Sequence, residues 1–129
     1  MTNQTLFNRV WKRLVDEFDK GQSTFLRPGS YSPSCRYEAP DGNHCAIGAA
    51  VGKKALIELK KYEGKDIVSA IKSNNYLSKY FKGVDTCLAD SLQIVHDNLD
   101  NWTSVENMKE VLRKKAAIYN VNVPKEKTK

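Results

Sequence analysis

Apolar residues recur every three to four positions over residues 4–20, and charged residues fill most of the positions between them. The apolar set is Leu6, Phe7, Val10, Trp11, Leu14, Val15 and Phe18. This spacing matches the 3.6-residue turn of an α-helix with one face against a core, so it predicts a helix over 4–20. Thr2, Asn3 or Thr5 can cap its start through a side-chain oxygen. Gly21 can end it.

The same periodicity returns in the second half of the chain. Asp85 can cap a helix over 85–101. Its expected core stripe is Leu88, Leu92, Val95 and Leu99, with Cys87 and Ile94 beside it. Thr103 and Glu106 have the spacing of a capping box, which predicts a last helix that runs to about Tyr119. The apolar positions of that helix are Val105, Met108, Val111, Leu112 and Ile118.

Shorter patterns separate these helices. Glycine, proline and serine are frequent over 21–34, which indicates a loop. Residues 35–38 alternate in polarity, and Pro40 with Asp41-Gly42 favours a tight reversal, so a short β-hairpin-like insert is expected near 35–44. Small apolar residues at 45–51 predict a tightly packed helical turn whose backbone a neighbouring element can approach closely. Further short helices are expected at 53–61 and 66–73, with another helical turn at 76–81.

These elements indicate a mainly α fold of about five helices with one hairpin-like insert. The chain has 129 residues, which is close to the commonest size of a single domain. We therefore expect one globular domain over 1–121. Pro124 and the lysines after it predict a basic flexible tail over 122–129.

The formal net charge of +6 matters less than its distribution. Residues 84–107 contain neither lysine nor arginine, whereas the segments on both sides are rich in lysine. The acidic residues of this stretch are Asp85, Asp90, Asp97, Asp100 and Glu106. Opposite charges of this kind can pair within the fold, which would weaken the field that attracts a polyanion. We therefore favour solubility over nucleic-acid binding as the reason for the lysines.

Leader, membrane and cysteine patterns point to one compartment. The first residues show no basic-then-apolar leader, and no apolar run approaches the ~20 residues that cross a bilayer. The three cysteines are Cys35, Cys45 and Cys87. An odd number favours free thiols or metal ligands over a disulfide framework. We expect a cytoplasmic protein with no membrane partner.

Cys35-Arg36-Tyr37, Asp41-Gly42 and Cys45-Ala46-Ile47-Gly48 together form a C-x-Y…D-G…C-A-[IV]-G signature. Later matches are Glu63-Gly64, Leu92–Asp97 and Trp102. Over about residues 7–119, this arrangement resembles small uncharacterised proteins of bacteriophages and prophage regions. The resemblance implies a phage origin, and so the cytoplasm of the host cell, but it supplies neither catalytic residues nor a cofactor. The family pattern continues with an apolar pair and a Pro-Asp turn, where this chain has Lys53 and Lys54, so a helix is expected to replace a loop there.

Cys45 is the candidate nucleophile. A helix that begins at Cys45 would lower the pKa of the thiol through its N-terminal dipole, and His96 could then act as the base. Asp97, Asp41 or Gln93 could orient that histidine. His96 and Asp97 are adjacent on the predicted helix and point about 100° apart, so we expect no direct pairing. The alternative is that His96 lies at the core boundary and bonds to backbone or water.

A metal site is the second chemical candidate. Cys35 and Cys45, with His44 or His96, could supply sulfur and nitrogen ligands to zinc. Nine residues separate the two cysteines, however, which is wider than the spacing of a zinc knuckle. The alternative is that both thiols pack as small apolar groups. We expect no cofactor, with zinc kept as the alternative.

Binding without chemistry is the function we favour for this sequence. We expect a phage-type accessory protein that binds, and inhibits, a host protein such as a component of a defence or housekeeping system. The candidate contacts are Tyr31, Arg36, Lys109, Arg113 and Lys114. One alternative is a small cysteine- or zinc-dependent enzyme. The other is a nucleic-acid-binding protein that uses its basic C-terminal helix.

Overall fold

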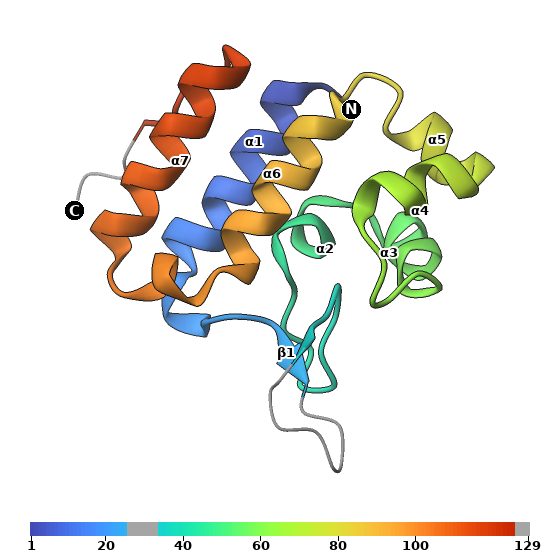
Figure 1. The fold of residues 1–129 in the computed structure, drawn as a ribbon, viewed down its shortest axis with the longest axis horizontal. Helices are drawn as coiled ribbons and strands as arrows, with labels where there is room; N and C mark the ends of the chain where they lie inside the picture. Colours follow the sequence, from blue (N-terminus) through green and yellow to red (C-terminus); the bar gives the residue numbers. More distant parts are fainter. Residues whose placement is uncertain (26–33, 126–129) are drawn as a thin grey trace.

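A computed structural model describes residues 1–25 and 34–125, apart from the side chains of Phe25, Ser34 and Cys35. The fold is mainly helical, as the sequence predicts (Figure 1). The α-helices are α1 (Asn3–Trp11), α2 (Ala46–Ala50), α3 (Lys53–Lys60), α4 (Ile67–Ser73), α5 (Asn75–Tyr80), α6 (Thr86–Asp97) and α7 (Val105–Tyr119). The described residues hold seven α-helices, more than the five or so expected, because the helical turns expected at 45–51 and 76–81 form the short helices α2 and α5. Within this described part, no helix is both long and apolar enough to cross a membrane.

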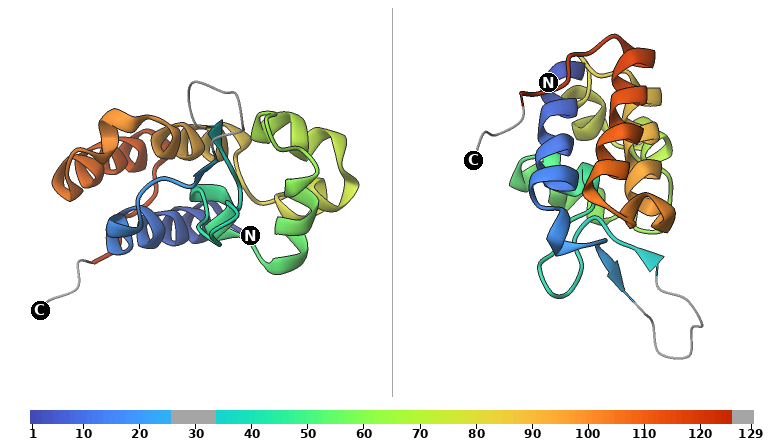
Figure 2. Two further views of the ribbon diagram at one scale, coloured as in Figure 1. Left: turned by 90° about the horizontal axis from the view of Figure 1, so that it is seen from below. Right: turned by 90° about the vertical axis from the view of Figure 1, so that its left-hand side faces the viewer.

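Helices α1, α6 and α7 run side by side, and α2 packs against α1 and α6 (Figures 1 and 2). Helices α3, α4 and α5 form a second group that reaches the first through α4 and α6. One hydrophobic cluster extends from Leu6 to Ala116 and joins both groups. Helix α6 is therefore central, since it contacts α1, α2, α4 and α7.

The first helix is shorter than predicted. Thr2 caps α1 by accepting a hydrogen bond from the Thr5 N–H at 3.1 Å. After Trp11 the chain continues as a π-helical turn over Lys12–Asp16 and a 3₁₀ turn over Phe18–Lys20. Gly21 ends this region with a φ of +67°, a left-handed value that glycine adopts without strain.

The hairpin-like insert predicted near 35–44 is not supported. The strands in the described residues are β1 (Thr24–Phe25) and β2 (Ser34–Cys35), which pair antiparallel with Thr24 opposite Cys35. Within 35–44 the pairing is limited to one isolated bridge between Glu38 and His44. So short a segment has too few cross-strand partners to form a ladder.

Helix α2 contacts the chain before it at van der Waals distance, as its small residues predict. A Cβ atom added to Gly48 would overlap the carbonyl oxygen of Tyr37 and would lie 2.9 Å from its carbonyl carbon. The Cys45 N–H also donates to that carbonyl oxygen at 3.3 Å. Gly48 is therefore required by close backbone packing.

The two C-terminal helices differ from prediction at their ends. Helix α6 ends at Asp97, and Leu99 lies in a 3₁₀ turn over Leu99–Trp102 with 69% of its surface exposed. Its assignment to the core is therefore wrong. The expected capping box does not form, because Ser104 caps α7 by accepting from the Asn107 N–H at 3.1 Å.

Two further expectations concern residues 53–61 and the tail. Lys53 begins α3, so the helix expected over 53–61 is present. The predicted tail is partly held, since the Asn122 N–H donates to the Gln4 side chain at 2.8 Å. Residues 126–129 lie outside the described part of the chain.

Candidate functional site

Cys45, the candidate nucleophile, is completely buried. It caps α2, and its Sγ accepts a hydrogen bond from the Gly48 N–H at 3.3 Å. Burial nevertheless raises the pKa of the Cys45 thiol to about 12, because desolvation outweighs that hydrogen bond. The expected lowering of this pKa is therefore wrong, and Cys45 holds its proton at neutral pH.

His96, the candidate base, is also completely buried. Its Nε2 lies 3.0 Å from the Ser23 backbone nitrogen, and an amide can only donate there. The proton of the ring is thus assigned to Nδ1, which lies 2.8 Å from Asp97 Oδ1. The expectation that these neighbours do not pair is wrong, because the 100° between adjacent Cα–Cβ directions is bridged by the imidazole ring.

The surroundings of His96 give it a structural role. Its Nε2 is hydrogen-bonded to Ser23 and its Nδ1 to Asp97, so neither ring nitrogen is available to take a proton from Cys45. The His96 carbonyl oxygen accepts from Trp102 Nε1 at 2.8 Å and from Gln22 Nε2 at 3.0 Å. The end of α6 is therefore hydrogen-bonded to Gln22, which is far away in the sequence, and to Trp102, which follows six residues later.

The candidate zinc ligands are not assembled in the described residues, which hold no group of three or more His, Cys, Asp or Glu side chains placed to bind a metal. His44 Nε2 lies 3.0 Å from Glu38 Oε2 instead. The side chain of Cys35 lies outside the described part, so the Cys35–Cys45 ligand pair stays a prediction.

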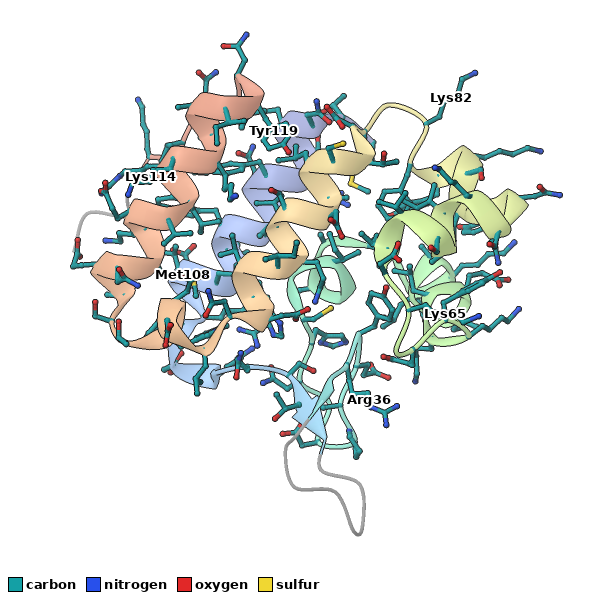
Figure 3. The ribbon with its side chains drawn as sticks, in the orientation of Figure 1. Arg36, Lys65, Lys82, Met108, Lys114 and Tyr119 are labelled. Atoms are coloured by element: carbon teal, nitrogen blue, oxygen red, sulfur yellow. The ribbon has the colours of Figure 1, made fainter. Side chains whose placement is uncertain are left out.

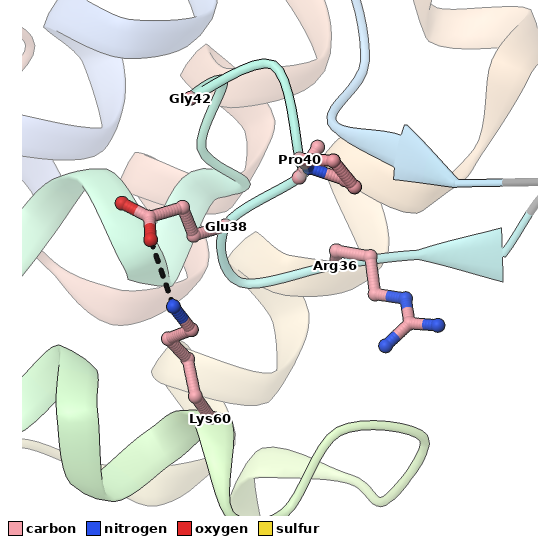
Figure 4. Close-up of a pocket in the computed structure, with 6 residues that line it drawn as sticks. Arg36, Glu38, Pro40, Gly42 and Lys60 are labelled. Atoms are coloured by element: carbon pink, nitrogen blue, oxygen red, sulfur yellow. Dashed lines mark hydrogen bonds and ion pairs between the residues drawn. The ribbon is translucent and has the colours of Figure 1, made fainter.

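A hollow of about 520 Å³ lies beside this histidine, between residues 36–42 and the end of α3. Figure 4 shows Glu38 and Lys60 pointing toward each other, with Arg36 directed elsewhere. The Lys60 Nζ lies 2.9 Å from Glu38 Oε1, and this hydrogen bond lowers the pKa of the Glu38 carboxyl. The hollow therefore presents a carboxylate that is already paired with Lys60 and lies within hydrogen-bond distance of His44.

The candidate partner contacts are spread over separate surfaces. Tyr31 lies outside the described residues, and Figure 3 shows Arg36 and Lys65 on the opposite side from Lys114 of α7. Lys109 Nζ lies 3.3 Å from Glu106, and Arg113 lies 4.0 Å from Glu110. Two of the three candidate cations on α7, Lys109 and Arg113, thus pair within their own helix.

The basic segments beside the acidic stretch neutralise only part of it, because Lys109 pairs with Glu106. In the described residues, the carboxylates of Asp90, Asp97 and Asp100 form no ion pair with lysine or arginine. The lysine ion pairs within single elements join residues three positions apart, as Lys109 and Glu106 do. Negative charge therefore remains on the surface of α6.

This charge faces a cleft of about 500 Å³ between α6 and residues 63–67, which we call the α6 cleft. Its charged lining residues are Glu63, Asp66, Asp90, Asp97, Arg36 and Lys65. Ile94 also lines it, and 56% of this side chain is exposed. The α6 cleft is thus acidic, with one uncovered apolar group on its α6 wall.

Three of these carboxylates are positioned by hydrogen bonds. Glu63 Oε1 accepts from the Tyr37 N–H at 3.0 Å, although burial raises the pKa of Glu63. Asp66 caps α4 by accepting from the Ser69 N–H at 2.8 Å, which lowers the pKa of Asp66. Asp97 Oδ1 accepts from Gln93 Nε2 at 2.9 Å as well as from His96. The acidic lining is therefore held by the fold.

Comparison with protein-family models, curated proteins and solved structures finds no match for the chain. The phage resemblance stays a prediction. Because a fold does not by itself imply a function, the function is inferred from the α6 cleft and the buried groups beside it.

Sequence reasoning missed the α6 cleft. Ile94 was placed beside the core stripe, where an apolar residue is usually buried. Two signals could have found the site: the lack of lysine and arginine over 84–107, and the helical spacing of Asp90, Ile94 and Asp97.

Proposed function

We propose that this chain is a phage-type accessory protein that binds a host protein and blocks one of its surfaces, with no covalent step of its own. The observation that carries the proposal is a contrast in access. The candidate reactive groups, Cys45 and His96, are fully buried, whereas the α6 cleft is open and its apolar Ile94 is exposed.

The contrast argues against the enzyme alternative. A cysteine nucleophile must reach its substrate as a thiolate, which requires access and a low pKa. Cys45 has neither, and the ring nitrogens of His96 bond to Ser23 and Asp97. Catalysis by this pair would require the region around α2 to open.

Proteins that act by binding and covering a partner's surface present exposed apolar groups with polar groups around them. Ile94 and the carboxylates of the α6 cleft have this arrangement. Phage accessory proteins of this size act on host enzymes in this way, and the family resemblance therefore favours a host protein as the partner.

The test is affinity purification of the tagged chain from host cells, followed by reconstitution. We expect to recover one host protein, also after nuclease treatment of the lysate. The same host protein should bind the purified chain in calorimetry. The matched variant is Cys45→Ser, whose hydroxyl can still accept from the Gly48 N–H, and it should bind equally. Loss of the biological effect in a folded Cys45→Ser protein would favour the enzyme instead. Recovery that nuclease abolishes would favour nucleic acid.

A further inference from the structure

In the described part of the chain, one face of α6 remains uncovered although α1, α2, α4 and α7 contact this helix. Asp90, Ile94 and Asp97 lie along it, because positions four and seven residues apart fall on the same side of an α-helix. All three line the α6 cleft. The α6 wall of the cleft is therefore an exposed apolar side chain between two carboxylates.

The cleft is acidic as a whole. Its lining has four carboxylates, those of Glu63, Asp66, Asp90 and Asp97, against the two cations of Arg36 and Lys65. Neither cation belongs to α6, so this helix contributes only negative charge to the lining. Clefts lined by one sign of charge focus the field on an incoming group of the opposite sign.

We propose that the α6 cleft binds a lysine- and arginine-rich segment of the partner protein, with an apolar side chain of that segment packed on Ile94. Charge complementarity selects this class, because the acidic lining repels nucleic acid and attracts a basic chain. The apolar contact distinguishes a peptide from a small cation. The inference rests on the proposed function, since it requires a protein partner.

The spacing of Asp90, Ile94 and Asp97 on α6 predicts the sequence pattern of the bound segment. From Asp90 to Asp97 the helix rises by roughly 10 Å, or about two turns. A helical segment with lysine at positions i and i+7 and leucine at i+4 presents the complementary pattern. An extended segment fits this spacing less well, because only its alternate side chains share a face, and cations two or four residues apart would lie roughly 7 or 13 Å from each other.

The probe is a short fluorescent peptide of that helical pattern, followed by anisotropy against the full-length protein at 0.05 and 0.15 M salt. We expect Asp90→Asn and Ile94→Ser each to weaken binding by about fivefold or more. A peptide with glutamate in place of lysine should not bind. Equal binding of the two peptides would overturn the proposal.

Matched controls change the same chemistry outside the cleft. Asp100→Asn removes a carboxylate of the same acidic stretch, and Ile118→Ser removes an isoleucine on α7 that is 68% exposed. Both should change the affinity by less than about twofold, because neither residue lines the cleft. Equal losses in Asp90→Asn and Asp100→Asn would show charge attraction without a site, and would contradict the inference.

The same measurements test two other possible occupants of the α6 cleft, a small cation and a second copy of this chain. Displacement of the peptide by equimolar spermidine or Mg²⁺ would indicate a small-cation site and overturn the inference. Self-association that Asp90→Asn abolishes would assign the cleft to a second copy of this chain instead. Thermal melting of each variant confirms that a loss of binding is not a loss of folding.

The host partner separates failure of this inference from failure of the proposed function. If the purified partner binds the Asp90→Asn and Ile94→Ser proteins as tightly as the wild type, the α6 cleft is not its site, although the protein still acts by binding. If no host protein is recovered, the proposed function itself fails.

Discussion

The Cys45 thiol caps a helix and yet keeps its proton, because desolvation opposes the thiolate more strongly than the Gly48 N–H favours it. Helix α2 has only five residues, which leaves a small dipole to offset that cost. Cys87 differs, since it lies exposed near the start of α6. Thiol reactivity in this protein is therefore decided by access.

Alkylation should separate these two cysteines. With iodoacetamide at pH 8, we expect the exposed Cys87 to react in the folded protein, and the buried Cys45 to react only after unfolding. Peptide mapping by mass spectrometry assigns each site separately. Rapid modification of Cys45 in the folded state would contradict its buried position and would revive the nucleophile hypothesis.

Glu63 gives a pH dependence that can be measured. Burial raises its pKa in the folded state, so the folded protein binds this proton first as the pH falls. Glu63 therefore lowers the free energy of unfolding at neutral pH, and this loss disappears as the pH drops through the raised pKa. Relative to Glu63→Gln, the wild type should gain stability between pH 7 and pH 4.

Glu63→Ala is the matched variant for the hydrogen bond. It leaves the Tyr37 N–H without its acceptor, which should cost about 1–2 kcal/mol at pH 7. Glu63→Gln keeps an acceptor without the buried charge, so at pH 7 it should be at least as stable as the wild type. Urea unfolding at several pH values measures both effects, and a pH-independent difference between wild type and Glu63→Gln would show that the pKa is not raised.

Helical periodicity predicted where α1 and α6 begin, because their buried residues recur at the helical spacing and their caps, Thr2 and Asp85, are local. It could not predict where α6 ends. The carbonyl oxygen of His96 bonds to Gln22 and Trp102, so a side chain from a distant segment ends the helix early. Periodicity also could not predict that Leu99 and Ile94 are exposed. Burial depends on which neighbouring element covers a side chain, and the spacing of apolar residues does not report this.

The close packing of α2 predicts a large effect of one methyl group. Gly48→Ala would drive its Cβ into the Tyr37 carbonyl, which is backbone and cannot move aside cheaply. We expect a loss of at least about 2 kcal/mol in the free energy of unfolding. The control is Gly52→Ala, whose Cβ would lie 3.7 Å from the nearest atom, Tyr80 Oη, and which should cost about 1 kcal/mol or less. Equal losses would show that the Tyr37 contact is not limiting.

At the scale of the whole molecule, the acidic and basic segments remain largely separate. Among the described residues, most lysine and arginine ion pairs join neighbours three positions apart, as in Lys20–Glu17, Lys61–Glu58 and Lys109–Glu106. The sequence shows the acidic stretch, but the α6 cleft needs residues 63–67 from elsewhere in the chain, and no local pattern connects the two. The cleft is therefore a product of tertiary packing.

This separation predicts how the nucleic-acid alternative will behave. Duplex DNA should bind weakly through α7 and be released between about 0.05 and 0.2 M salt, as phosphate contacts alone require. Replacing Arg113 and Lys114 with glutamine should weaken this binding further, whereas Asp90→Asn should not weaken it, since that carboxylate lies in the α6 cleft. Electrophoretic shifts across a salt series measure all three proteins. DNA binding that persists at 0.2 M salt, or that depends on sequence, would make nucleic acid the partner and the acidic cleft a secondary feature.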